Sequence, residues 1–569
     1  MSAHGGAGHG GAAAAGARPR VGDAWIVVTL FLAAVAVRLG VIGSSGGLHT
    51  LNGYDDGVYF SATTSLLHGL VPYRDFVLLH PPGILVLAAG PMAALYGAGL
   101  SDSDTLAAMR LVFVGLGGLN TVLVFFAGRH LSRAAGVVAA SLYAVWGPVI
   151  REERTMLLET IVILGTLVAL ALVPPLSNRD VSGRWRPVLA GVVGGLAIAT
   201  KLWAVVPLGL IILGLLVVRR WRRALVLAVT TAATAVAVLA PFLVLAPSQL
   251  WNMVVAAQVG RPGRAGGSWP RVAEMINLPS WPFSALVDPT VPTAPVNPNV
   301  VEGIVLASAR GPWVTAAVVA VGLVVSVLVA VRLPVTRMWV ALLAVQSVVL
   351  LSTPVFFSGY ASFVAPALVL VAGALGHLVW NASWVRGSED HPGGARPGNR
   401  RALVAGLAAC TWAVLAWGAV LTDRGSPIRP PLAPVLAEAT CVASDSPAAI
   451  VLADRLTPNL DNGCPAVVDF SGVVYTFPWT GDGLIGPTAL REQSPQFQQF
   501  ARDYFGSADH VILRRRARTG LDEESLRQLR ERPLIRKAYP QVYGPAGSSA
   551  PAAEPAAPDS DEVPSDDGE

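Results

Sequence analysis

The sequence predicts an all-α polytopic membrane protein with about 11 transmembrane helices and a small extracytoplasmic α/β domain near its C-terminus. Of its 569 residues, 53% are hydrophobic and only 14% are charged, and the mean hydropathy is +0.56. A soluble chain carries about 25% charged residues. Long apolar runs alternate with short basic loops, as in proteins that cross a bilayer repeatedly. This alternation ends near residue 421, where a polar segment begins.

The expected elements follow in chain order. Residues 1–22 are rich in Gly and Ala and are expected to be disordered. They lack the pattern of a cleavable signal peptide, so we expect the first span to stay as an anchor. The transmembrane domain then covers 23–422. Its expected spans are 24–43, 106–128, 132–150, 156–174, 187–200, 203–218, 223–246, 313–331, 337–353, 361–380 and 402–421.

Basic loops set the expected orientation, because Lys and Arg are enriched in cytoplasmic loops. Eleven spans and a cytoplasmic N-terminus place every basic loop inside. The apolar stretch 81–100 would invert the later loops if it crossed, so we expect an interfacial helix within a first external loop, 44–105. Residues 187–218 would span roughly 48 Å as one helix, so we expect a hairpin. The basic loops are 128–133, 178–186, 219–223, 331–337 and 384–401.

The region after the last span is expected to be external. Residues 430–545 contain short β-type runs (448–456, 466–470 and 510–516) and a polar helical run that begins at Asp522, so they predict a small α/β domain. Cys441 and Cys464 lie there and would form a disulfide in an oxidising compartment, although two unpaired thiols remain an alternative. Residues 546–569 predict a disordered acidic tail.

The expected partner of this chain is the lipid bilayer. A pI near 9.3 would also suit a nucleic-acid-binding protein. However, its Arg residues fall in short loops between spans, and no basic stripe is interleaved with aromatic residues. We therefore expect no nucleic acid partner and a multi-pass protein of the cell membrane.

Two adjacent carboxylates, Asp55 and Asp56, follow the first span. Because neighbouring carboxylates repel each other, one of them needs a cation, a proton or a metal ion. In an external cleft either of them could act as general base on a hydroxyl group, and any divalent metal would be held here. Alternatively, the pair caps or turns the chain into a helix that begins near Gly57.

Other external positions carry further candidates. Glu159 would lie about one turn inside a span, an expensive place for an unpaired carboxylate, and Arg154 precedes it. Lys201 lies at the tip of the expected hairpin, where it could balance a phosphate charge or reach the interface. The side chains of Arg38 and Arg110 are expected to reach toward the membrane interface. Glu152 and Glu153 are expected to form ion pairs with other interfacial charges. Gln258, Arg261 and Arg264 could bind phosphate or sugar.

The motifs of the first external loop resemble those of the GT-C superfamily of polyprenyl-phosphate-sugar-dependent glycosyltransferases. The likeness is greatest to the protein O-mannosyltransferase and aminoarabinose transferase branch. It rests on "DD" at 55–56, "GLVPYRD" at 69–75 and "HPP" at 80–82, with weaker similarity as far as residue 265. The resemblance implies that Asp55 is the catalytic carboxylate, whereas Asp56 stands where relatives often have Glu. It adds Arg74, Asp75 and His80 as substrate-binding candidates.

The resemblance implies an integral-membrane glycosyltransferase that inverts the anomeric carbon. It would move a sugar from a polyprenyl-phosphate donor to an extracytoplasmic glycan, lipid or protein, and a divalent metal requirement stays open. A transporter or flippase of a lipid-linked substrate is the alternative, and it predicts an internal repeat and polar residues at mid-membrane depth. A third possibility is a scaffold whose external domain binds without catalysis.

Overall fold

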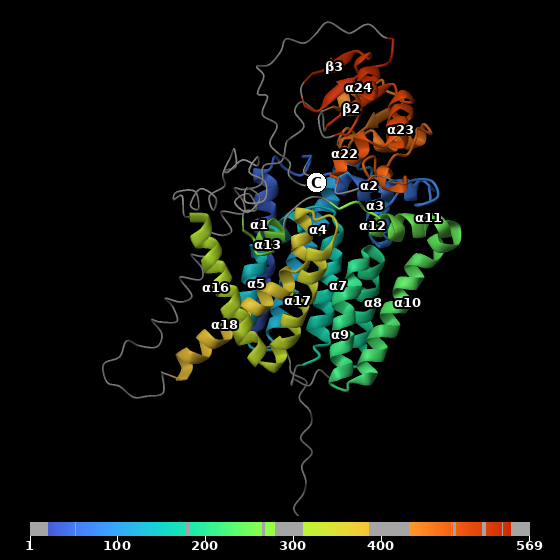
Figure 1. Cartoon of the computed structure of the whole chain (residues 1–569). Helices are drawn as coiled ribbons and strands as arrows, with labels where there is room; N and C mark the ends of the chain where they lie inside the picture. The colour runs from blue at the N-terminus through green and yellow to red at the C-terminus, as the bar shows by residue number, and fades with distance from the viewer. Residues whose placement is uncertain are drawn as a thin grey trace, which may run out of the picture.

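The computed structural model describes residues 21–51, 53–176, 183–263, 268–278, 311–385, 432–478, 481, 485–514, 519–537 and 539–547. A bundle of helices carries a small C-terminal domain at one of its ends (Figure 1). Four of the sequence predictions lie outside the described residues. These are the leader up to residue 20, the span 402–421, Arg264 and the tail after residue 547.

Helices form the bundle because apolar residues dominate each segment. Its longer members are α1 (Val21–Ser44), α4 (Asp102–Gly128), α10 (Trp221–Leu245), α16 (Gly311–Arg332), α17 (Arg337–Ser352) and α18 (Ala365–Val385). Its shorter members are α5 (Arg133–Ala144), α6 (Gly147–Glu153), α7 (Leu158–Leu172), α8 (Trp185–Thr200) and α9 (Val205–Val217).

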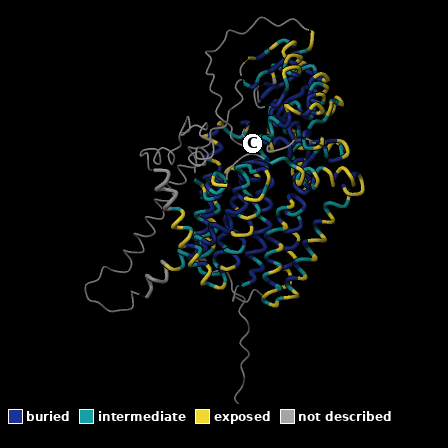
Figure 2. The backbone as a smooth tube through the Cα atoms, viewed as in Figure 1, coloured by how far each residue is buried: buried dark blue, intermediate teal, exposed yellow. Residues whose placement is uncertain are grey.

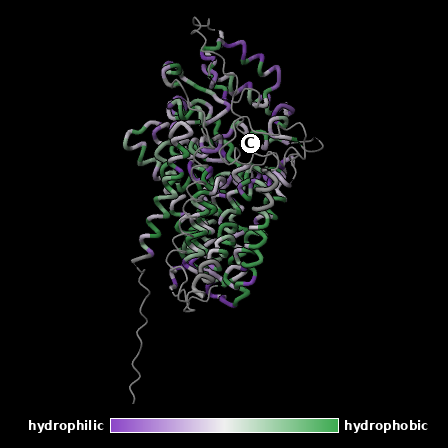
Figure 3. The backbone as a smooth tube through the Cα atoms, turned by 90° about the vertical axis from the view of Figure 1, so that its left-hand side faces the viewer, coloured by the Kyte–Doolittle hydropathy of each residue, from purple (hydrophilic) through white to green (hydrophobic). Residues whose placement is uncertain are grey.

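Four described helices are long and apolar enough to cross a membrane, namely α1, α4, α10 and the helix Pro334–Ser352. A fifth is obtained if α5 and α6, which are bent by 66°, form one span. Further apolar helices of 10–17 residues accompany them, so the total of about 11 stays a prediction. The bundle is buried in its centre and hydrophobic along its length, while the C-terminal domain is more hydrophilic (Figures 2 and 3).

Two breaks within the bundle have local causes. The expected span 132–150 is not one straight helix, because Trp146 is extended and Pro148 lies in the first turn of α6, a position where Pro starts a helix and cannot continue one. The expected hairpin over 187–218 is confirmed, since Lys201 adopts an extended conformation between α8 and η1 (Leu202–Ala204), which leads into α9.

A layer of short helices covers the end of the bundle that faces the C-terminal domain. It contains α2 (Asp55–Leu67), α3 (Gly83–Gly97), α11 (Pro247–Trp251), the π-turn η2 (Asn252–Ala256) and α12 (Ala257–Val259). With 15 residues, α3 is about 22 Å long, shorter than the roughly 30 Å hydrocarbon core. Its first residue, Gly83, packs against the last turn of α8, where a Cβ atom would lie 2.5 Å from the Ala199 carbonyl carbon.

The C-terminal domain contains a four-stranded sheet in the order β1-β2-β4-β3. The pair β1–β2 is parallel, whereas β2–β4 and β3–β4 are antiparallel. The strands are β1 (Val442–Ser444), β2 (His510–Leu513), β3 (Leu534–Arg536) and β4 (Gln541–Tyr543). The helices are α20 (Pro447–Leu452), α21 (Leu456–Asp461), α22 (Pro487–Glu492), α23 (Pro495–Gly506) and α24 (Glu523–Arg530).

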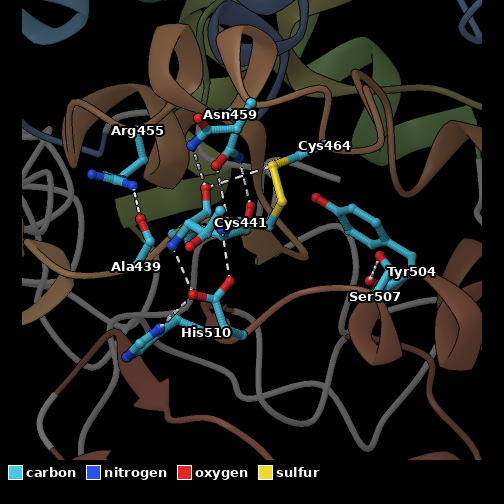
Figure 4. Close-up of a disulfide and its surroundings, with 12 residues drawn as sticks. Ala439, Cys441, Arg455, Asn459, Cys464, Tyr504, Ser507 and His510 are labelled. Atoms are coloured by element: carbon cyan, nitrogen blue, oxygen red, sulfur yellow. Dashed lines mark hydrogen bonds and ion pairs between the residues drawn. A yellow bond between two sulfur atoms is a disulfide. The ribbon is translucent and has the colours of Figure 1, made fainter.

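Two of the expected β-type runs are not strands. Residues 448–456 form α20 and a turn, because Pro447 starts a helix there, and 466–470 form no regular element. The Cys441–Cys464 disulfide joins the edge strand β1 to the segment after α21, with a Cα–Cα distance of 5.7 Å (Figure 4). Asp509 accepts hydrogen bonds from the backbone amides of Thr440 and Cys441 at this point.

The C-terminal domain packs directly on the short-helix layer. A Cβ atom at Gly57 of α2 would lie 2.3 Å from the backbone nitrogen of Ala448, so only Gly permits this approach. The Asp102 carboxylate accepts hydrogen bonds from the Thr457 amide and hydroxyl, at 2.9 and 2.6 Å. The domain is thus held against the part of the chain that contains the candidate site.

Candidate active site

The two adjacent carboxylates of the first external loop have opposite environments. Asp55, the first residue of α2, is exposed, whereas Asp56 is completely buried. Asp56 accepts hydrogen bonds from Arg110, Thr155 and its neighbour Gly57. Burial alone would raise the pKa of Asp56, but Arg110 and the hydrogen-bond donors outweigh it and hold the pKa below its usual value. Asp56 is therefore an ionised structural anchor, and only Asp55 is accessible to a substrate.

A second ion pair joins α7 to the tip of the α8–α9 hairpin. The ammonium group of Lys201 donates a hydrogen bond to the carboxylate of Glu159, and both side chains are largely buried. Burial lowers the pKa of Lys201, but Glu159 and its other neighbours outweigh this and raise the net pKa, so the group stays charged. Glu152 of α6 lies within electrostatic range of both members of the pair.

Aromatic rings enclose the same ammonium group. Lys201 Nζ lies 4.4 Å from the ring centroid of Trp203 and 4.2 Å from that of Tyr360. Such cation–π contacts stabilise a desolvated cation by roughly 1–2 kcal/mol. Tyr360 belongs to η4 (Ser358–Phe363), the connection between α17 and α18. The lysine is thus held by three elements that are far apart in the sequence.

Tyr59 of α2 connects this cluster to Asp55. Burial raises the pKa of Tyr59, and the negative charges of Asp55, Glu159 and Asp469 raise it further. These groups therefore lie within electrostatic range of a single buried hydroxyl. The ring of Tyr59 also meets the ring of His80 edge-on, with 6.2 Å between the centroids.

His80 lies within electrostatic range of two cations, Lys201 and Arg261. Its imidazole is half-buried, and burial lowers its pKa well below the usual value, with Lys201 and Arg261 lowering it further. His80 is therefore neutral at physiological pH. The Tyr73 hydroxyl donates a hydrogen bond to the His80 carbonyl oxygen, and the Gln258 amide donates one to that of Leu79, at 2.8 Å each.

Arg261 is the second cation of the site. Its guanidinium carbon lies 4.3 Å from the ring centroid of Tyr475 in η6 (Gly472–Thr476), a turn of the C-terminal domain. The Nε atom of Arg261 is buried without a hydrogen-bond partner among the residues that the structure describes. A buried guanidinium donor that lacks an acceptor costs free energy unless a ligand supplies one.

The same domain places a further carboxylate near Asp55. The hydroxyl of Tyr54 donates a hydrogen bond to Asp469 at 2.9 Å and accepts one from the backbone amide of Ser471 at 2.8 Å. The Ile485 amide donates to the carbonyl oxygen of Gly263, two residues beyond Arg261. Both flanks of the site therefore touch the C-terminal domain.

Other sequence candidates have structural partners instead. Arg74 and Asp75 are solvent-exposed and form a bidentate pair with each other, at 2.9 and 2.8 Å. Asp75 also accepts a hydrogen bond from the Val71 amide, which closes the turn around Tyr73. Arg154 is buried and donates a hydrogen bond to the Ser45 hydroxyl at 3.2 Å.

The expectation that Arg38 and Arg110 reach toward the interface is wrong. Both side chains are completely buried, because each neutralises a buried carboxylate. Arg38 pairs with Glu153, which also accepts hydrogen bonds from Asn120 and Tyr143. Glu153 thus has a charged partner, as expected, but the pair is completely buried.

The residues at Asp55 and Asp56 do not fit a metal site. Both oxygens of Asp56 are engaged by protein donors. Within the described ranges, no group of three or more His, Cys, Asp or Glu side chains is arranged to hold a metal ion. We therefore derive no step through a metal.

Several site residues had no distinctive pattern in the sequence. Tyr59 and Tyr360 belong to no motif that we recognised, and only the folded chain brings Tyr360 to Lys201. Asp469 and Tyr475 lie more than 400 residues after Asp55 in a domain without a recognisable motif. An available signal was the aromatic-rich segment 354–360, which contains Phe356, Phe357 and Tyr360.

Comparisons with known proteins identify the fold. No family model and no curated protein matches this chain. Among solved structures, ArnT from Cupriavidus metallidurans in the apo state aligns with 93% of this chain and 100% of its own, at a TM-score of 0.53 and 14% identity. The oligosaccharyltransferase of Archaeoglobus fulgidus, solved with Zn and sulfate, aligns with 92% of this chain and 73% of its own, at a TM-score of 0.50 and 13% identity.

These similarities show that the chain shares the fold of ArnT and of the archaeal oligosaccharyltransferase. The alignment covers the C-terminal domain as well as the bundle, since it includes nearly the whole chain. The chemistry of this protein has to be argued from its own residues.

Proposed function

We propose that this chain is an integral-membrane glycosyltransferase that uses a polyprenyl-phosphate sugar as donor. One observation carries the proposal: the ring of Tyr360 packs on Lys201, 4.2 Å from its Nζ atom, and the same Tyr360 lies within electrostatic range of the carboxylate of Asp55 and the guanidinium of Arg261. Such a site offers a base on one side and charge balance for a phosphate on the other.

The reaction follows from these positions. Asp55 accepts the proton of an acceptor hydroxyl, and the hydroxyl oxygen forms a bond to the anomeric carbon of the donor sugar. The bond between that carbon and the phosphate oxygen breaks, and polyprenyl phosphate leaves with the electron pair. Attack from the side opposite to the phosphate inverts the anomeric carbon.

The two cations serve the leaving group unequally. Lys201 is already paired with Glu159, so the negative charge of Glu159 partly offsets its attraction for the phosphate. Arg261 has an unsatisfied buried Nε atom and accordingly supplies the stronger interaction with the phosphate. His80, which is neutral, adds no further positive charge to this region.

The proposed topology places this site on the extracytoplasmic face of the cell membrane. The N-terminus is cytoplasmic, the basic loops 128–133 and 219–223 are inside, and the C-terminal domain is outside. The short-helix layer and the C-terminal domain lie at the same end of the bundle, which supports this arrangement (Figure 1). Reporter fusions at Ser101 and Ser132 test it, because Ser101 must report outside and Ser132 inside.

Release of the carrier phosphate tests the activity. The purified protein is incubated with a panel of polyprenyl-phosphate sugars and with glycan, lipid and protein acceptors. We expect Asp55→Asn to lower turnover by roughly 10²–10⁴-fold without changing the melting temperature. Asp104→Asn is the matched control, because Asp104 is an exposed carboxylate at the start of α4 that pairs with the exposed His49. Equal turnover of the wild type and Asp55→Asn would refute the proposal.

The same experiment separates the alternative of a transporter. A transporter or flippase moves the lipid-linked sugar across the bilayer and leaves its phosphate bond intact. Translocation of the donor in vesicles, without release of carrier phosphate for any donor and acceptor, would therefore favour that alternative.

A further inference from the structure

We propose that an open groove on helix α23 of the C-terminal domain binds a neutral saccharide chain as the acceptor. This inference rests on the proposed function and specifies its acceptor as a glycan. The groove has a volume of about 740 Å³, within the range of small-molecule sites. Its lining residues are Pro465, Val467, Pro495, Gln496, Gln499, Phe500, Asp503, Tyr504 and Ser507.

One face of α23 forms the floor and rim of the groove. The lining positions recur every three or four residues along the helix, so their side chains lie on one face. The rings of Phe500 and Tyr504 lie nearly parallel, with 6.1 Å between centroids and 8° between planes. Phe470 packs behind them, 5.8 Å from Phe500 and 6.0 Å from Tyr504. Tyr504 is buried and Phe500 is partly exposed, so the accessible ring of the floor is that of Phe500. The rings packed against it hold it in place, and its face suits the flat C–H face of a sugar ring.

The rim of the groove carries the groups that bind hydroxyls. Gln496, Gln499, Asp503 and Ser507 are exposed and together supply amide, carboxylate and hydroxyl donors and acceptors. Gln499 donates a hydrogen bond to Asp503 at 2.8 Å, which orients both side chains. An aromatic floor with a few oriented polar groups is the composition of a ligand site that selects a polar ligand with apolar faces.

The charges of the residues that line the groove favour a neutral ligand. The described residues that line the groove include one carboxylate, Asp503, and neither Lys nor Arg. Arg502 donates a hydrogen bond to the rim residue Gln499 at 3.0 Å, but its charge is paired with Asp522. A phospholipid headgroup or the phosphate of the donor would therefore be repelled by Asp503 with little to offset the repulsion. The hydroxyls of a neutral sugar, by contrast, donate hydrogen bonds to a carboxylate. The groove thus matches the acceptor and not the donor.

The wall of the groove leads to the proposed base. Val467 lines the groove, and two residues later Asp469 accepts the hydrogen bond from Tyr54, which directly precedes Asp55. Two residues of extended chain span at most about 7 Å. A saccharide whose terminal hydroxyl meets Asp55 would therefore continue along this segment into the groove. The Cys441–Cys464 disulfide fixes the start of the segment beside Pro465 (Figure 4).

Saccharide binding to the full-length protein in lipid nanodiscs tests this inference. The probes are neutral linear oligosaccharides of four to six sugars, built from hexoses or pentoses, and the readout is saturation-transfer difference NMR on the sugar C–H protons. We expect signals for at least one probe. Gln496→Ala and Asp503→Ala should each weaken that binding by roughly fivefold to tenfold, and Phe500→Leu should weaken it further.

Control variants separate this result from misfolding. Gln528→Ala on α24 changes an exposed glutamine on another helix of the domain and should bind as the wild type does. Melting temperatures identify any unfolding in Phe500→Leu, while Gln496→Ala and Asp503→Ala alter only exposed side chains. An absence of saccharide binding, equal binding by the groove variants, or binding of an extended peptide in place of every saccharide would each overturn the inference.

The experiment also separates this inference from the proposed reaction. Asp55→Asn should keep saccharide binding while it loses turnover. Saccharide binding in a protein that releases no carrier phosphate from any donor would leave the groove standing and remove the proposed reaction. Turnover with a lipid or protein acceptor, combined with no saccharide binding, would support the proposed reaction and refute the saccharide groove.

Discussion

The Oδ2 atom of Asp56 lies 2.5 Å from the Nη2 atom of Arg110, and both side chains are completely buried. Arg110 comes from α4, and it also donates hydrogen bonds to the carbonyl oxygens of Leu48 and Thr50. This pair therefore fixes the loop before α2 to the bundle. The ion pair buries Asp56, so Asp55 is the carboxylate of the two that faces solvent.

Removal of the charge of Asp56 should destabilise the protein. In Asp56→Asn the guanidinium of Arg110 stays buried without its counter-ion, which costs about 3–5 kcal/mol. We expect a clear fall in the melting temperature of the purified protein. Asp75→Asn is the control, because it breaks an exposed pair with Arg74 that contributes about 0–1 kcal/mol. Equal melting temperatures for the two variants would contradict the structural role of Asp56.

Lys201 is expected to act on the chemical step. Lys201→Gln removes the cation beside Glu159, and the loss of one charge-stabilising group lowers turnover by about 10²–10³-fold. The measurement is kcat for release of carrier phosphate. Lys537→Gln, a lysine exposed on the C-terminal domain, should keep the activity of the wild type. Unchanged kcat in Lys201→Gln would limit the role of this residue to packing.

The helical bundle and the small C-terminal domain followed from hydrophobic patterning. The hairpin at Lys201 was predicted because we expected the basic loops 178–186 and 219–223 to lie on one side of the membrane. The bend between α5 and α6 was not predicted, since the apolar run continues through it and Pro148 alone marks the break. In the C-terminal domain, 448–456 has an apolar composition that suits a strand or a helix equally, and tertiary packing decides between them.

The candidate site was predictable only in part. Sequence motifs located Asp55, His80 and Lys201, but they could not distinguish Asp55 from Asp56, because that difference depends on Arg110, 54 residues away. Tyr475 could not be found at all. Its contact with Arg261 exists only because the C-terminal domain folds back onto the short-helix layer, and single-sequence patterns do not encode such long-range docking.

The contact between Arg261 and Tyr475 predicts an effect on donor binding. Tyr475→Leu removes the ring that orients the guanidinium, a cation–π contact of about 1 kcal/mol, so KM for the donor should rise roughly fivefold while kcat changes less. Tyr475→Phe keeps the ring and should restore the KM of the wild type. A parallel fall of kcat in both variants, with KM unchanged, would contradict a role of Tyr475 in positioning Arg261.

The environment of His80 predicts a dependence of stability on pH. Its pKa in the folded protein lies below the unfolded value of about 6.5, so below pH 6.5 the unfolded chain binds more protons. Stability contributed by neutral His80 is complete above about pH 6.5 and is lost as the pH falls toward the folded pKa, by less than about 1.4 kcal/mol per pH unit because the ring is partly exposed.

Melting temperatures between pH 7.5 and pH 5 check this expectation. The decline should be smaller in His80→Asn than in the wild type, since Asn does not titrate. His49→Asn serves as the control because His49 is exposed and pairs with Asp104. A pH profile of His80→Asn that matches the wild type would contradict the assignment of a low pKa to His80.

The Cys441–Cys464 disulfide should stabilise the C-terminal domain and, through it, the site. It closes a loop with a sequence separation of 23 residues, for which the loss of chain entropy in the unfolded state corresponds to about 3 kcal/mol. The double variant Cys441→Ser/Cys464→Ser should melt at a lower temperature than the wild type. Reductant should lower the melting temperature of the wild type and leave that of the double variant unchanged.

The double variant should also raise KM for the donor, because Pro465, Asp469 and Tyr475 all follow Cys464 closely in the chain. A normal KM with a normal melting temperature would contradict this role of the disulfide. It would mean that packing on the short-helix layer is enough to hold the segment after Cys464 in place.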